Sequence, residues 1–305
     1  MAEISIIIPC HNAASFIENC LGCVCGQTIA DRVQFVVVDD GSTDGTADIA
    51  RSFLERRGRL QQARIICLPQ NKGVANARIA GIKEAEGDYL MFIDADDLAD
   101  PAMCEKMLRK ASEEDCDMVV CDYKSIRGER VEAVTECYKE PFLQQLILCT
   151  VTGALWNKLV RRDMLLRPDF RFPVRDFSED YAYCLQFAIY SKKIGYVPEP
   201  LYSYVHRTDS VVSAASEEKK RKRYEDDMEN FRLDLEILEA NGLLEKYREE
   251  IIAHKLKMKN TYRSDRALWK STFPELGREM SSSKYVSWRS RLAYAATLLG
   301  IKSSR

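Results

Sequence analysis

The sequence predicts an α/β fold in which helices flank a mainly parallel central sheet, followed by a small helical C-terminal region. Two observations lead to this fold class. Short runs rich in Ile and Val alternate with helical segments through the first 123 residues, and these runs are continuously apolar, which is typical of strands covered on both faces. After Ser216 the chain becomes charged and carries Leu and Ile at helical spacing.

The predicted strands follow one another along the first part of the chain, at residues 4–8, 35–39, 64–68, 89–94 and 118–123. From about residue 141 we expect longer helices, interrupted by two polar stretches that contain proline, FRFPVRDFSED and GYVPEPLYSYVHRTDS. We therefore expect one domain at 1–213 and a helical region at 214–305 that breaks at Gly242.

Composition and charge limit the function classes. The formal net charge is −2, from 45 basic and 47 acidic side chains, which gives no case for nucleic acid as a partner. No signal-peptide pattern follows Met1, and the apolar run Leu292–Ile301 is about half of the ~20 residues that a membrane-spanning helix needs. The 11 cysteines are scattered through apolar patterns, so we expect reduced thiols and a cytoplasmic protein.

Three carboxylates follow the fourth predicted strand, in the stretch MFIDADD. Ligands of parallel sheets bind beyond the carboxyl ends of the strands. The hard oxygens of Asp94 and Asp96 suit Mg²⁺ or Mn²⁺ together with a substrate diphosphate. The alternative is an acidic turn that faces solvent, in which Asp97 or Asp100 caps the next helix. The pattern alone favours neither interpretation.

Two other strand ends carry polar clusters: PCHN follows the first strand, and DDGSTDGT follows the second. Turn and capping chemistry would account for Gly41, Ser42 and Thr43, but it leaves Asp39 and Asp40 without a role. Because the carboxyl ends of parallel strands share one edge of the sheet, we expect a binding site at that edge.

Five stretches, taken in order, resemble glycosyltransferase family 2: SIIIPCHN, VVVDDGSTDGT, NKGVANAR, GDYLMFIDADD and FSEDYAY. The resemblance spans roughly residues 4–213. It implies the Rossmann-like GT-A fold, with a nucleotide-sugar-binding half at 1–105 and an acceptor-binding half at 106–213. It also implies an inverting enzyme that uses a nucleotide-sugar donor.

The resemblance implies which residues bind the nucleotide. Pro9 and Asn12 lie in the family's first nucleotide-contacting turn, and His11 between them borders the base, although the family often has Tyr at this position. Asp39 occupies the position that usually contacts uracil.

The remaining donor positions come from two later stretches. Gly73 and Arg78 fall in the segment that flanks the donor. Asp94, Ala95 and Asp96 match the family's D-x-D motif, in which the first acid tends to face the donor ribose and the second binds the metal. The implied metal is Mn²⁺ or Mg²⁺.

The FSEDYAY stretch contains the candidate general base. The apolar periodicity after residue 180 predicts a helix, with Ser178 as its N-cap and with Glu179 and Asp180 in the first turn, where the helix dipole favours carboxylates. By itself this is an ordinary helix start. The resemblance implies that Asp180 is the catalytic base, and we place Glu179 beside it in the catalytic group.

His206 and Arg207 are further candidates. A neutral His206 imidazole could complete a metal site with Asp96, and Arg207 could bind a phosphate. The alternative for His206 is a side chain packed beneath a loop. Trp156, in the stretch LWNKLVRRD, is either an acceptor platform or a core residue, and Asn157 and Lys158 beside it receive no role.

These residues predict a metal-dependent inverting glycosyltransferase that moves a sugar from a UDP-sugar to a hydroxyl of a glycan or lipid-linked saccharide. One alternative is a phosphohydrolase of the haloacid dehalogenase type, which also has D-x-D at a strand end, but near the first strand. Another is a protein that binds nucleotide sugars without turnover.

The end of the chain combines an apolar stripe with basic residues. The stripe consists of Trp288, Leu292, Ala295 and Leu299, and the basic residues are Lys284, Arg289, Arg291, Lys302 and Arg305, with no acidic residue from 284 onward. This segment could lie on an anionic membrane surface. The alternative is a helix that packs on its own domain or on a second copy in a homodimer.

Overall fold

The computed structural model describes residues 2–136, 138–139, 141–207 and 216–298. Contacts divide the chain into two compact units. Unit 1 comprises Met1–Cys137 and Gly153–Leu233, and unit 2 comprises Tyr138–Thr152 and Asp234–Arg305. The domain boundaries expected from the sequence, at residues 105 and 213, stay predictions.

The central sheet belongs to unit 1. Its strands are β1 (Ile4–Cys10), β2 (Val33–Asp39), β3 (Ala63–Cys67), β4 (Tyr89–Phe92), β5 (Leu98–Ala99), β6 (Met118–Arg127), β7 (Arg130–Val134), β8 (Lys158–Arg161) and β9 (Ile194–Val205). Their order is β3-β2-β1-β4-β8-β6-β9-β5, and β7 pairs with β6. The strands β3, β2, β1 and β4 are mutually parallel, whereas β8 is antiparallel to both of its neighbours. The α/β fold class is confirmed, and the sheet becomes mixed beyond β4.

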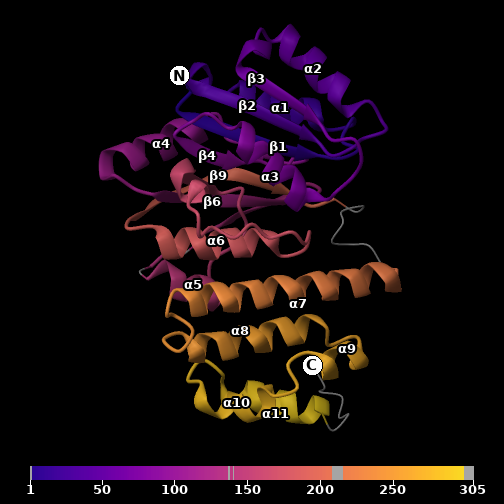
Figure 1. The fold of residues 1–305 in the computed structure, drawn as a ribbon, viewed down its shortest axis with the longest axis vertical. Coiled ribbons are helices and arrows are strands. Elements are labelled where there is room, and N and C mark those ends of the chain that lie inside the picture. Colours follow the sequence, from indigo (N-terminus) through magenta and orange to yellow (C-terminus); the bar gives the residue numbers. More distant parts are fainter. Residues whose placement is uncertain (1, 137, 140, 208–215, 299–305) are drawn as a thin grey trace. The chain divides into compact units, whose positions relative to one another are not determined.

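Helices cover both faces of the parallel part (Figure 1). The helices of the chain that have most of their length in unit 1 are α1 (Ile17–Cys25), α2 (Thr46–Arg56), α3 (Val74–Glu84), α4 (Met103–Glu114), α6 (Glu179–Tyr190) and α7 (Glu217–Ala240). Alternate residues of β1 point to opposite faces. Ile6 therefore packs in the core that includes α1, while Ile7 faces α3. A Cβ on Gly81 of α3 would lie 2.5 Å from Ile7 Cγ2, so glycine allows α3 to lie close to the sheet.

Unit 2 is helical among its described residues. Its helices are α5 (Phe142–Ile147), α8 (Arg248–Thr261), α9 (Arg266–Ser271), α10 (Leu276–Glu279) and α11 (Trp288–Leu298). Both α5 and α10 pack on α8. The helix break predicted at Gly242 is confirmed, because α7 ends at Ala240 and Gly242 has φ +68°.

The loop expected at GYVPEPLYSYVHRTDS is wrong for residues 195–205, which belong to β9 in the interior of the sheet. We expected a loop because this stretch contains Pro198 and Pro200. Along β6, Cys121 is opposite Val197 and the next residue, Asp122, is opposite Pro200, so Pro198 and Glu199 fall in a bulge. Proline is tolerated at a bulge because no ladder hydrogen bond is needed from it there. Residues 208–210 of this stretch lie outside the described residues.

The long helices expected from residue 141 are also wrong in part, since α5 is short and residues 158–161 form β8. Every cysteine among the described residues is a free thiol, and Cys20, Cys104 and Cys121 are buried in the core, as the scattered pattern predicted. Within the part of the chain that the structure describes, no helix has the length and apolar character that crossing a membrane requires.

Candidate active site

The polar clusters predicted after β1 and β2 meet at one edge of the sheet. Both strands end there because they run parallel, with Cys10 opposite Asp39. Asn12 has φ +50°, and its Oδ1 accepts a hydrogen bond from the Thr43 amide at 2.9 Å. His11 Nδ1 lies 2.8 Å from the Asp40 carbonyl oxygen. Pro9, in contrast, is a buried strand residue.

Two neighbouring carboxylates organise the turn after β2. Asp39 is 5% exposed and accepts from the Ser42 amide at 3.0 Å. Asp40, which the sequence left without a role, accepts from the amides of Lys72 and Gly73 at 2.8 and 2.7 Å. Asp40 therefore joins the second motif to the third. The only signal for it in the sequence was an acidic pair at the end of an apolar strand.

Gly73 precedes α3 and has φ +91°. A Cβ at this position would overlap the Asp176 carboxylate, so both the backbone conformation and the space require glycine. Asp176 Oδ1 in turn accepts from the Ala75 amide at 3.4 Å. The predicted donor segment is thus packed against the loop that precedes α6.

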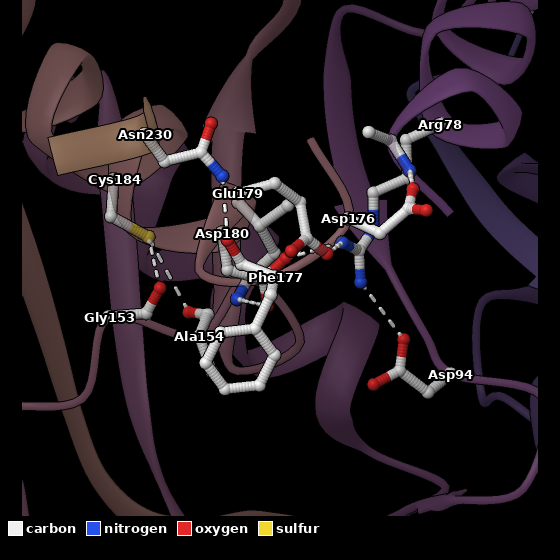
Figure 2. Close-up of polar contacts among 12 residues, drawn as sticks. Arg78, Asp94, Gly153, Ala154, Asp176, Phe177, Glu179, Asp180, Cys184 and Asn230 are labelled. Atoms are coloured by element: carbon white, nitrogen blue, oxygen red, sulfur yellow. Dashed lines mark hydrogen bonds and ion pairs between the residues drawn. The ribbon is translucent and has the colours of Figure 1, made fainter. Parts of the chain in front are cut away.

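Arg78 of α3 joins the last two motifs (Figure 2). Its guanidinium is 3% exposed and donates to Glu179 Oε1, to Asp180 Oδ1 at 2.5 Å and to Asp94 Oδ1 at 3.2 Å. We call these four residues the Arg78 cluster. Arg78 was expected to flank the donor, but in this structure it contacts the candidate acids. Periodicity cannot reveal this convergence, because the three carboxylates come from two distant elements.

The electrostatics of the Arg78 cluster follow from its burial and its excess of acids. Burial alone disfavours the charge of Arg78, but Asp180, Glu179 and Asp94 outweigh it and raise the pKa of the guanidinium. Burial raises the pKa of Asp94 to about 6, against the opposing effect of Arg78. Burial and the neighbouring Asp180 also raise the pKa of Glu179 well above its usual range.

Asp180 keeps access to solvent, with 21% of its side chain exposed. Its second oxygen, Oδ2, accepts from the Leu155 amide at 3.2 Å. Ser178 is the N-cap residue of α6, as predicted, but its side chain makes no capping hydrogen bond. It has φ +63°, and its Oγ donates to Asp227 Oδ1 at 2.5 Å instead. Asp180 is therefore held through both carboxylate oxygens, from α3 and from the segment before β8.

The remaining acids of MFIDADD differ from one another. Asp96 is 35% exposed and pairs with Arg207, whose Nε lies 3.4 Å away. Asp97 is 1% exposed and accepts from the Tyr202 hydroxyl and the Val205 amide, both at 2.7 Å. Asp97 is therefore neither a solvent-facing acid nor a helix cap, and burial raises its pKa to about 8. Ala95 is buried in the core at 5% exposure, and its contact with the donor stays a prediction.

His206 hydrogen-bonds Ser125, with 2.9 Å between Nε2 and Oγ, and its ring lies against Tyr204. Across the described ranges, no three His, Cys, Asp or Glu side chains gather as a metal site would require. The role of His206 as a metal ligand stays a prediction. Trp156 is a core residue, 7% exposed and stacked on Tyr202 with the ring centroids 4.6 Å apart.

The sequence matches a known family. The model of the family described as glycosyl transferase family 2 matches residues 5–163. EpsH of Bacillus subtilis, to which a glycosyltransferase activity is ascribed, is 29% identical over 259 residues, which cover 81% of this chain and 72% of EpsH. The cholesterol galactosyltransferase of Borreliella burgdorferi is 26% identical over 233 residues, covering 70% of this chain and 63% of that enzyme.

Solved structures share the fold. The crystal structure of residues 1–349 of S. aureus TarS in complex with UDP has a TM-score of 0.68 at 19% identity, and the match covers 99% of this chain and 88% of that chain. The mannosyltransferase PcManGT from Pyrobaculum calidifontis, in complex with GDP-Man and Mn²⁺, has a TM-score of 0.57 at 18% identity, covering 98% of this chain and 86% of that chain. At such identities the likeness concerns the fold.

Proposed function

Because the chain belongs to glycosyltransferase family 2 and has the GT-A fold, we propose that it is a metal-dependent inverting enzyme. It would transfer a sugar from a UDP-sugar to a hydroxyl of a glycan or lipid-linked saccharide. The observation that carries the proposal is the Arg78 cluster, which holds Asp94 and Asp180 on one guanidinium. The candidate donor-side acid Asp94 and the candidate base Asp180 therefore both bind the Arg78 side chain. A displacement reaction requires the groups that act on the donor and on the acceptor to be close together.

The nucleotide would bind at the turns after β1 and β2. Asp39 lies in the turn that Ser42 closes, and Asn12 ties this turn to the end of β1. The TarS structures contain UDP or UDP-GlcNAc, and the PcManGT structure contains GDP-Man. Donors of this class in proteins with the same fold support a nucleotide sugar here.

Asp180 would act as the general base. It removes the proton from the acceptor hydroxyl as that oxygen attacks the anomeric carbon, while the bond to the nucleoside diphosphate breaks on the opposite face and the configuration inverts. Its partial exposure allows contact with an acceptor. Glu179 is 6% exposed and pairs with Arg78, so its part is to balance charge and not to touch substrate.

The carboxylate oxygens of Asp96 are suitable ligands for a divalent cation. Magnesium in such enzymes is usually bound by one or two carboxylates together with substrate phosphates and waters, which agrees with one partly exposed carboxylate and no preformed cluster among the described residues. When bound, Mn²⁺ or Mg²⁺ would stabilise the charge that develops on the leaving diphosphate. Arg207 is the present partner of Asp96 and would become free to bind a phosphate.

The experiment that tests the function is UDP release from a panel of UDP-sugars with Mn²⁺ or Mg²⁺. We expect release from one donor, and loss of this release on chelation or in Asp96→Asn. Asp88→Asn changes an exposed carboxylate before β4 and serves as the matched control, with release unchanged. Without release, calorimetry with UDP separates the alternatives: binding without turnover supports a binding protein, and absence of binding contradicts the uridine donor.

We propose that α11 contacts an anionic membrane surface. Trp288 and Leu292 are 65% and 60% exposed, although Tyr294 of the same helix is buried against Trp269 with the ring centroids 5.2 Å apart. The neighbouring Arg289 and the lack of acids from 284 onward match anionic headgroups. Leu299, Lys302 and Arg305 of the predicted segment lie outside the described residues.

Flotation with phosphatidylglycerol-containing vesicles tests this surface. We expect binding that Trp288→Ser and Leu292→Ser together abolish, and no binding to pure phosphatidylcholine. Flotation unaffected by the two substitutions would contradict the proposal. A concentration-dependent dimer that the same substitutions dissociate would show that a second copy covers α11.

A further inference from the structure

The short segment Gly153–Leu155 contacts the proposed base. The amide of Leu155 donates to Asp180 Oδ2 at 3.2 Å, and the Leu155 side chain is fully buried. Because the donor is a backbone amide, its direction depends on the groups that fix the peptide units around it. Those groups come from the LWNK stretch and from α6.

Two buried side chains hold the carbonyl groups of this segment. Lys158 is 1% exposed, and its Nζ donates to the Ala154 carbonyl at 2.6 Å. Cys184 of α6 also contacts these carbonyl groups, with its Sγ 3.2 Å from the Gly153 carbonyl oxygen and 3.6 Å from that of Ala154 (Figure 2). A hydrogen bond from a charged donor in a dry environment is stronger than a neutral one, so Lys158 is the main restraint.

Lys158 is itself fixed by the neighbouring residue. Its Nζ also donates to Asn157 Oδ1 at 2.8 Å, and Asn157 is fully buried. The Asn157 side-chain amide donates to the Cys121 carbonyl of β6 at 2.9 Å and to Glu136 Oε1 at 3.0 Å. Burying a lysine is unfavourable unless its charge and hydrogen bonds are satisfied. This network is therefore a specific connection from the sheet to the segment that contacts Asp180.

We propose that Lys158 and Cys184 are positioning residues that hold Gly153–Leu155 so that the Leu155 amide keeps the Asp180 carboxylate oriented toward the acceptor. The inference rests on the proposed role of Asp180 as the base. With Arg78 on Oδ1 and Leu155 on Oδ2, rotation of the carboxylate is restricted. A small rotation of a catalytic group is enough to slow a displacement reaction.

The direct readout is the Leu155 amide resonance in the ¹H–¹⁵N NMR spectrum, identified by its change in Asp180→Asn, which needs no substrate. In Lys158→Met, the Leu155 amide should lose its alignment with Asp180 Oδ2, and its proton resonance should move upfield because the hydrogen bond is weakened. Turnover should fall by about tenfold, with the KM for the donor within about twofold of wild type.

A second, milder variant tests the inference if Lys158→Met does not fold. Cys184→Ala removes only the thiol, and we expect the same two changes at a smaller size, with Cys184→Ser restoring wild-type behaviour. Lys259→Met is the matched control for Lys158: Lys259 is also 1% exposed and donates to backbone carbonyls, but it lies in unit 2. Cys104→Ala controls for loss of a buried thiol. Both controls should leave the Leu155 amide resonance and the turnover of the folded protein unchanged.

The outcomes separate the inference from the function on which it rests. Folded Lys158→Met and Cys184→Ala proteins with a wild-type Leu155 amide resonance and wild-type turnover would overturn the positioning role. If Lys158→Met does not fold, Cys184→Ala and its serine rescue decide. Near-normal turnover in Asp180→Asn would instead overturn the proposed base, and the Leu155 amide resonance would still report whether Lys158 fixes the amide that contacts Asp180.

Discussion

Arg78 in unit 1 and the buried bases of unit 2 are satisfied in different ways. In unit 1, the buried cation Arg78 is surrounded by three carboxylates, and the pKa values of Asp94 and Glu179 are raised. In unit 2, which also buries the acids Asp234 and Glu250, the buried bases are Lys259 and His254. Lys259 donates to the carbonyls of Trp269 and Thr272, and burial lowers the pKa of His254 to about 4.

This difference distinguishes the candidate active site in unit 1 from buried bases in unit 2 that have only a structural role. Carbonyl dipoles are sufficient to place a buried lysine, and burial in unit 2 favours the neutral forms of its bases. Three acids around one guanidinium leave an excess of negative charge. Such an excess does not stabilise a fold, so we interpret it as a sign of a catalytic role. The two units should therefore respond differently to loss of a cation and to acid.

The largest effect is expected from Arg78→Met. It leaves three carboxylates together without their cation, and loss of one partner from a buried ion pair typically costs about 3–5 kcal/mol. Urea unfolding, followed by hydrogen exchange in α3 and β1, measures it. Arg32→Met breaks the exposed pair with Glu3 and should cost less than about 1 kcal/mol. Similar small losses in both variants would show that Arg78 stabilises the fold no more than an exposed ion pair does.

The next effect concerns the chemistry of the Arg78 cluster. Asp180→Asn should keep donor binding but lose roughly 10²-fold or more in turnover, the usual scale for a positioned general base. The matched control is Asp48→Asn, which changes an exposed acid in the first turn of α2. Turnover and calorimetric binding of UDP are measured for both variants. Equal turnover in the two would exclude Asp180 from the mechanism.

The smallest effect is the acid response of unit 2. Because the pKa of His254 is lowered to about 4 in the folded state, the unfolded chain binds the proton more tightly. The stability that a neutral His254 contributes is present above its unfolded pKa of about 6.5 and is lost as the pH falls toward 4. Between pH 7.5 and 5 the wild type should lose about 2 kcal/mol more stability than His254→Gln.

Hydrogen exchange in α8 reports this loss locally, with peptides from β1 as the internal comparison. Exchange that accelerates equally in both variants would show that His254 does not set the acid response. Exchange that accelerates first in β1 would reverse the comparison between the units.

Much of the catalytic framework could be predicted from local pattern. The apolar runs that became β1, β2 and β4 are buried along their whole length, so their composition alone marks them as strands. The runs that became β3 and β6 were also predicted, although β3 exposes Arg64 and Cys67. The acids at the ends of β2 and β4 could be identified because charge is out of place at the end of a buried strand. Glycosyltransferase family 2 was recognised from the same stretches, and the match of the family model confirms it.

Predictions from local pattern were wrong where contacts between residues distant in the sequence determine the structure. The strand β9 contains two prolines and reads as a loop, and only its pairing with β6 and β5 makes it a strand. Asp97 looks like its neighbour Asp96, yet Tyr202 and the Val205 amide, more than a hundred residues away, bury it. A one-dimensional pattern records spacing along the chain and carries no information about such partners.

The sequence by itself therefore determined the α/β class, the parallel first half of the sheet, the edge at which the polar clusters gather, and the family. The tertiary structure decided which acids share Arg78, which one keeps access to solvent, and that Lys158 is connected to Asp180 through the Ala154–Leu155 backbone. The physical reason is that burial and periodicity act over a few residues, whereas the balance of charge among buried groups depends on every element that packs around them.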